Sequence, residues 1–178
     1  MTKKLLPFLI TIFFSISSFA QLSVLKMTGK ESRYSKIGYG LFANLSIPVN
    51  EAGNQHAVLE LMDVAYFPSK EEGDFLIAYI SVKARFRNVF SSEGNTGFLL
   101  EPQVGYCRVV RRGEYKATYG DGVAVAVVGG YSLEVDDRGN SIVFGLKYER
   151  DMAGREHTLQ AVGFRVLYSF SIGRRRGY

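Results

Sequence analysis

The feature that most constrains the fold of this chain is an alternation of apolar and polar side chains with a period of two residues. It runs through eight extended segments, separated by seven turn clusters at residues 28–32, 49–54, 68–74, 91–96, 111–115, 136–140 and 151–156. Loops this short join antiparallel neighbours, because a parallel pair needs a long crossover. We therefore expect an all-β fold, an eight-stranded antiparallel up-and-down meander that closes into a barrel and so loses both edges.

The stretch "GFLLEPQVGYCRVV" (97–110) illustrates the two faces of such a strand. Because side chains alternate along a strand, Glu101 and Gln103 share one face with Leu99 and Cys107. The opposite face is wholly apolar and carries Phe98, Leu100, Pro102, Val104 and Tyr106. The same division recurs in segments 36–47, 76–87, 142–149 and 161–172. Pro102 has no N–H to donate to a ladder, which predicts a β-bulge at that position.

Alternation alone does not say which face lies inside the barrel. A soluble barrel turns its apolar face inward, whereas a membrane barrel turns that face to lipid and keeps charges in its lumen. The polar face here also carries many Gly, Ala and Val residues, which suit the narrow interior of an eight-stranded barrel better than a solvent face. The run from Val162 to Ile172 has the length of a tilted membrane strand. Aromatic residues on the apolar face lie toward strand ends, as membrane girdles do: Tyr39, Tyr106, Tyr131, Tyr148 and Phe170. These observations favour a transmembrane β-barrel.

In that orientation a set of charged side chains shares the lumen: Lys83, Arg85, Glu101, Lys147, Glu149 and Arg165, with Arg87 beside them and Glu134 near one rim. The hairpin turn at 91–96 predicts that Lys83 lies roughly opposite Glu101. Paired charges that plug the interior are the favoured interpretation, because unpaired charge in a narrow barrel is costly. A narrow polar pathway remains the alternative, and Glu101→Gln would change conductance only in a pore.

The N-terminus predicts a secreted precursor. Lys3 and Lys4 precede an apolar run, and small Ser18 and Ala20 flank Phe19 in the pattern that a signal peptidase cleaves. We expect a signal peptide over residues 1–20 and a mature barrel domain over 21–178. Both lysines leave with the signal peptide, so the net charge falls from +5 to +3, which does not indicate nucleic-acid binding.

The strands "LLEPQVGY", "IVFGLKYER" and "AVGFRVLYSFSI" resemble those of the small outer-membrane β-barrel proteins of Gram-negative bacteria. The resemblance covers nearly all of residues 21–178 and implies a location in the cell outer membrane, with outer-membrane lipid as a partner. It also implies that the barrel-assembly machinery reads the last strand through Val162, Phe164, Val166, Tyr168 and Phe170. The tail "GRRRGY" departs from the family pattern, because it sets the terminal Tyr178 beyond that strand.

The residues that commonly carry chemistry are few. His56 and His157 fall at opposite mouths of the expected barrel, and Cys107, the single cysteine, fits as a small buried side chain. We therefore expect no catalytic residues, no metal and no cofactor, and a structural or surface-interaction role; the oligomeric state is not indicated. Two alternatives stay open. One is a lipid-modifying barrel enzyme near His157, and the other is a soluble lipocalin-like barrel that binds a small apolar ligand in a cavity lined by Phe98, Val104, Tyr106 and Phe164.

Overall fold

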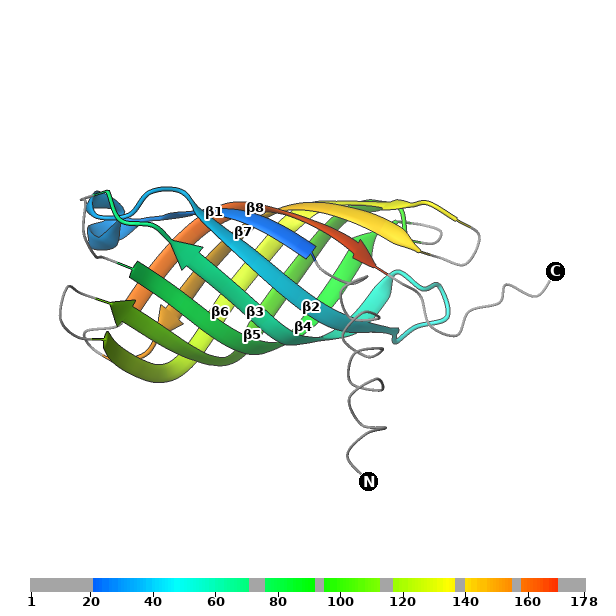
Figure 1. Ribbon diagram of the computed structural model, residues 1–178. Coiled ribbons are helices and arrows are strands. Elements are labelled where there is room, and N and C mark those ends of the chain that lie inside the picture. The colour runs from blue at the N-terminus through cyan, green and yellow to red at the C-terminus, as the bar shows by residue number, and fades with distance from the viewer. Residues whose placement is uncertain are drawn as a thin grey trace, which may run out of the picture.

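The computed structural model is an all-β barrel, and it describes residues 21–70, 76–91, 95–112, 117–136, 140–154 and 158–169. Eight antiparallel strands follow one another around the barrel in chain order, and β1 closes against β8 (Figure 1). The elements are β1 (Gln21–Met27), the 3-10 helix η2 (Gly29–Arg33), β2 (Gly38–Pro48), β3 (Gln55–Phe67), β4 (Leu76–Phe90), β5 (Gly97–Arg112), β6 (Ala117–Glu134), β7 (Ser141–Met152) and β8 (Thr158–Ser169). The expected closed, up-and-down barrel of eight strands is confirmed. Within the described ranges, no helix has the length and apolar character needed to cross a bilayer.

The two ends of the barrel differ in what they carry. At the end called here the η2 end, η2 connects β1 to β2, and β3–β4, β5–β6 and β7–β8 are joined there. The opposite end, called the terminal end, holds the start of β1, the end of β8 and the other three connections. The expected signal peptide, His157, Phe170 and the C-terminal tail lie outside the described residues.

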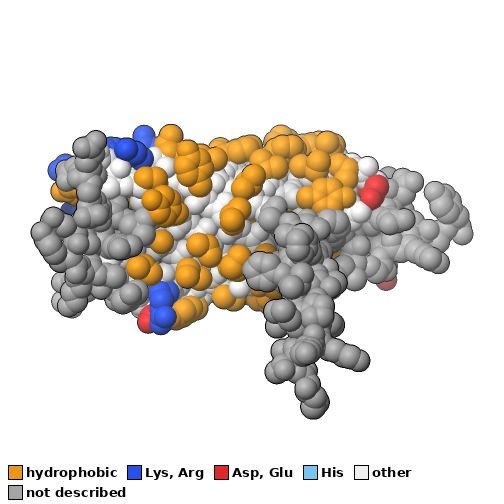
Figure 2. All heavy atoms as spheres, in the orientation of Figure 1, with side chains coloured by type: hydrophobic (Ala, Val, Ile, Leu, Met, Phe, Trp, Pro, Cys, Tyr) orange, Lys and Arg blue, Asp and Glu red, His pale blue; other side chains and the backbone are white. Residues whose placement is uncertain are grey.

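The two faces of each strand separate as the alternation predicts. In β1 and β7 every second residue is buried, and the residues between them are exposed or half-buried. The buried face points into the barrel and the apolar face points out: Phe98 is 72% exposed, whereas Glu101 is 1% exposed. The outward face of the strands is therefore the apolar one, and Figure 2 shows hydrophobic side chains over the middle of the face of the barrel that is in view.

The bulge predicted at Pro102 is wrong. Pro102 lies opposite Val127, and the register between β5 and β6 runs through it without a shift. On the β4 side the pairs Arg85–Gln103 and Asn88–Leu100 keep one register across the proline. Proline gives no N–H to the ladder at this position, and the paired residues on either side of it keep the strands in register.

The register shifts instead along β3. It moves between Ala43 and Asn44 on β2 and between Glu60 and Asp63 on the β4 side of β3. Both Leu61 and Met62 are exposed on the outer face, so β3 carries one residue more than alternation allows. As a result, Glu60 and Asp63 both point into the barrel.

Close approach of the strands explains one of the inward glycines. A Cβ at Gly105 would lie 1.9 Å from the carbonyl oxygen of Val82 on the neighbouring strand. No side chain fits there, so the glycine lets β4 and β5 approach and the sheet coil tightly. The backbone of β4, and not a long side chain, occupies the space beside this glycine.

Candidate functional site: a charged layer inside the barrel

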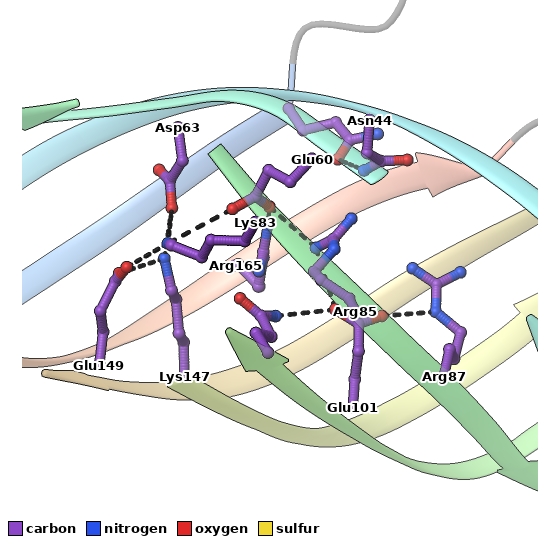
Figure 3. A network of polar contacts seen from close by, with 12 residues as sticks. Asn44, Glu60, Asp63, Lys83, Arg85, Arg87, Glu101, Lys147, Glu149 and Arg165 are labelled. Carbon is purple, nitrogen blue, oxygen red and sulfur yellow. Dashed lines mark hydrogen bonds and ion pairs between the residues drawn. The ribbon is translucent and has the colours of Figure 1, made fainter. Parts of the chain in front are cut away.

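The interior of the barrel is built in three layers. A cluster of apolar side chains fills the η2 end: Leu25, Met27, Ala65, Phe67, Tyr79, Cys107, Val109, Ala124, Ala153, Leu159 and Ala161. A second, smaller cluster fills the part toward the terminal end: Phe42, Val89, Leu99, Val128, Val143 and Leu167. Between them lies a layer of charged side chains, all buried (Figure 3).

The structure places all six charged residues singled out from the sequence on the inner face, each 4% exposed or less: Lys83, Arg85, Glu101, Lys147, Glu149 and Arg165. Arg87 is buried beside them as expected, and the structure adds two further charged side chains to the layer: Glu60 and Asp63. Asp151, which is also buried and lies two residues from Glu149 on β7, brings the carboxylates to the same number as the cations. The interior layer therefore holds five basic and five acidic side chains.

One half of the layer is built on two lysines. Lys83 Nζ lies 2.7 Å from Asp63 Oδ2, and Lys147 Nζ lies 2.5 Å from the same oxygen. Both ammonium groups also pair with Glu149, which in turn accepts a hydrogen bond of 2.7 Å from the Tyr79 hydroxyl. Two cations and two carboxylates thus alternate across β3, β4 and β7, so that each charge faces opposite ones.

The other half is built on arginines. Arg85 Nη1 lies 2.9 Å from both Glu60 Oε2 and Glu101 Oε1, and Arg87 donates from Nε to Glu101 Oε2 at 2.7 Å. Arg165 donates to Glu60 at 2.9 Å and stacks over the Phe42 ring with its guanidinium carbon 3.7 Å from the centroid. A planar guanidinium suits this position, because it pairs with a carboxylate and covers an aromatic face at once.

Glu60 joins the two halves. Its carboxylate contacts Arg85, Arg165 and, at 3.4 Å, Lys83, so a single buried group meets three cations from two strands. Sequence reasoning missed Glu60 and Asp63 because they lie three residues apart, and strict alternation puts such residues on opposite faces. The signal that could have found them is the pair of apolar residues between them, Leu61 and Met62, which marks the extra residue of the bulge.

The predicted pairing of Lys83 with Glu101 is wrong. Lys83 lies opposite Gly105, and Glu101 is held instead by Arg85 and Arg87. Counting back from a turn at 91–96 puts residue 83 opposite residue 104, within one residue of its observed partner, so the turn does not support a Lys83–Glu101 pair. The hairpin closes at the pair Phe90–Phe98.

The polar residues at the terminal end close that mouth. His56 lies inside the barrel with Nδ1 3.1 Å from Ser46 Oγ and Nε2 3.0 Å from the Gly53 carbonyl oxygen. Glu134, half-buried near the rim, accepts a hydrogen bond from the backbone N–H of Asn95 at 3.0 Å. Across the described ranges, no group of three or more His, Cys, Asp or Glu side chains is placed to hold a metal ion.

The residues assigned to other roles from the sequence lie on the outer face. The four that a soluble binding barrel would use for its cavity point outward and are between 46% and 72% exposed: Phe98, Val104, Tyr106 and Phe164. Of the assembly strand, Phe164 is exposed, and Val166 and Tyr168 are half-buried, on the same outer face of β8. A soluble binding barrel would need an apolar interior, but here the charged layer occupies the interior.

Comparisons of the chain with protein-family models, with curated proteins and with solved structures find no match.

Proposed function

We propose that this chain is an integral β-barrel protein of a bacterial outer membrane, with its interior closed by its own side chains. The observation that carries the proposal is an inversion of the usual arrangement: charged groups are buried inside, and large apolar side chains cover the outside. An aqueous protein rarely exposes a continuous apolar patch beyond a few hundred Å². A lipid environment removes that difficulty, because the apolar band then contacts acyl chains.

The limits of the apolar band support a bilayer as its surroundings. Polar side chains on the outer face of the strands lie at the ends: Lys26, Arg108, Asp121, Arg150, Thr158 and Gln160 toward the η2 end, and Gln55 and Asn88 toward the terminal end. Figure 2 shows charged groups at the two ends of the hydrophobic band. Between these limits β2, β5 and β6 each present about nine to eleven residues, the number that a tilted strand needs to cross a bilayer.

A row of aromatic rings follows one margin of the band. Phe90, Phe98, Tyr131 and Phe144 lie directly opposite one another across β4, β5, β6 and β7. The rings of Phe98 and Tyr131 meet edge to face with their centroids 5.4 Å apart. Aromatic belts of this kind occupy the level of the lipid headgroups in membrane barrels.

The role we propose is structural or one of surface interaction, not catalysis. The charged side chains of the ion-pair network are buried and paired with one another, so none of them is left free to act on a substrate. A topology with both termini in the periplasm puts η2 and its neighbouring loops on the cell surface. Outer-membrane lipid and the assembly machinery are the partners of this proposal.

Fractionation of expressing cells, followed by a detergent gel of unboiled and boiled samples, tests the proposal. A folded membrane barrel resists the detergent, so we expect the protein in the outer-membrane fraction with a mobility that changes on boiling. A protein found in the soluble periplasmic or secreted fraction would contradict the proposal and would favour the soluble binding barrel.

A further inference from the structure

A shallow apolar groove interrupts the outer wall of the barrel over β6, β7 and β8. It has a volume of about 450 Å³, within the range of small-molecule sites. Its walls are the outward side chains of Val127, Leu146, Tyr148, Val162 and Phe164, and backbone at Gly129, Lys147 and Gly163 completes the lining.

The groove exists because Gly129 faces outward without a side chain. A Cβ built at Gly129 meets no atom within 4 Å, so the space above this residue is open. Its neighbours across the ladder are Leu100 and Leu146, both large and exposed. A glycine between two such leucines leaves a notch in an otherwise filled apolar surface.

Two cations lie beside the groove on its η2 side. Lys26 is paired with Val162 in the ladder between β1 and β8, and Arg150 follows Tyr148 on the same face of β7. Ladder geometry puts their Cα atoms about 5 Å and about 7 Å from those of these two lining residues. In the described part of the chain, no carboxylate forms an ion pair with either of them, whereas Arg108, the other outward cation of the band margin, is neutralised by Asp121 at 2.7 Å.

From this juxtaposition we propose that the groove holds one acyl chain of a lipid whose phosphate-bearing headgroup has a net negative charge, and that this phosphate pairs with Lys26 and Arg150. An apolar channel with unneutralised cations at one end matches an anionic amphiphile and no neutral apolar ligand. The lipid lies in the leaflet at the η2 end. The inference rests on the proposed membrane location and deepens it, because it names one lipid class and one site on the wall.

The chain contains no tryptophan, so one introduced tryptophan reports on a single place. The Tyr148→Trp variant carries the reporter in the groove, and the Tyr66→Trp variant carries it on β3, at a residue of similar exposure (47% against 41%). Each is reconstituted in phosphatidylcholine vesicles that contain a minor fraction of dibrominated phosphatidylglycerol or dibrominated phosphatidylcholine. The measured quantity is the ratio of tryptophan quenching by the anionic brominated lipid to quenching by the neutral one. Taking this ratio removes the effect of the depth of each tryptophan in the bilayer, because both lipids carry bromine on the acyl chain.

We expect this ratio to be about 5 or more for Tyr148→Trp, because two basic residues beside the groove favour the anionic lipid. For Tyr66→Trp we expect a ratio near one. Adding Lys26→Gln and Arg150→Gln should return the ratio for Tyr148→Trp to near one. Adding Gly129→Leu, which fills the notch, should weaken quenching there by both lipids. Ala84→Leu adds the same side chain to the outer face of β4 and should leave the quenching unchanged.

Three outcomes would overturn the inference. Equal ratios at the two reporters would mean that the groove has no preference for the anionic lipid. Weaker quenching by both lipids at Tyr148→Trp than at Tyr66→Trp would mean that something else, such as a second copy of the chain, covers the groove. Absence of quenching at both reporters would mean that the barrel is outside the bilayer, and the proposed function would fail with it.

Discussion

Glu60 is the residue on which the interior depends most, because it contacts Lys83, Arg85 and Arg165 and is wholly buried. Glu60→Gln keeps the shape of the side chain and removes its charge. Breaking a buried ion pair by removing one partner costs about 3–5 kcal/mol. We expect a loss of that order in the free energy of unfolding, measured by urea titration of the barrel in lipid vesicles.

Asp121→Asn is the matched control for Glu60→Gln. Asp121 also pairs with an arginine, Arg108, but both side chains are about half exposed on the outer face. Exposed pairs contribute about 0–1 kcal/mol, so this variant should unfold near the midpoint of the unaltered protein. Equal losses for the two variants would show that the central layer is not what stabilises the barrel.

At the scale of the strand, inward glycines govern how closely neighbours approach. Gly105→Ala would drive a Cβ into the carbonyl oxygen of Val82, whereas a Cβ at Gly129 meets open space. Overpacking of this kind costs about 1–3 kcal/mol. We expect Gly105→Ala to lower the unfolding midpoint in urea and Gly129→Ala to leave it unchanged or raise it slightly.

The opposite result, a larger loss for Gly129→Ala than for Gly105→Ala, would contradict the close approach of β4 and β5. The pair is a fair comparison because both positions gain the same methyl group in the middle of a long strand. They differ only in which face of the barrel the group enters.

Alternation predicted the faces of β5, β7 and β8 because nothing interrupts their period. It failed on β3, where the bulge changes the parity between Glu60 and Asp63, so half of the carboxylates in the ion-pair network were missed. It also failed on the partner of Glu101, since the faces of a strand follow from its sequence, but its register depends on where the loop closes. The face on which a residue lies depends on its own strand, whereas its partners across the barrel depend on the register of all the strands.

For the whole molecule, closure of β1 against β8 is the property that turns a sheet into a barrel. Leu22 and Val166 lie opposite each other across this seam, and both point outward. Their Cβ atoms should be about 4.5–5.5 Å apart, close to the separation that a disulfide needs. Leu22→Cys with Val166→Cys should therefore form a disulfide, seen as a mobility shift between oxidised and reduced samples.

Leu22→Cys combined with Val104→Cys, on the far wall, should form no disulfide and serves as the control. Cys107 is buried inside the barrel and does not compete in either variant. A disulfide in both variants, or in neither, would contradict the closed arrangement of β1 and β8.

The layered interior also makes a prediction about transport. Apolar clusters lie on both sides of the charged layer, and its ion pairs hold the charged groups against one another, which disfavours an open path for ions. In a planar bilayer, we expect the reconstituted protein to show no single-channel steps, and Glu101→Gln to show none either. Steps whose size changes in Glu101→Gln would establish the narrow polar pathway instead.

The contact of Arg165 with Glu60 has a consequence for the order in which the barrel is made. Arg165 lies on β8, the last strand in the chain, and its partners Glu60 and Phe42 lie on β3 and β2. A chain that has paired its earlier strands without β8 leaves Glu60 without one of its three cations, in surroundings where an uncompensated charge is costly. That cost disappears when β8 joins the barrel, so we expect this ion pair to favour complete barrels over partial ones.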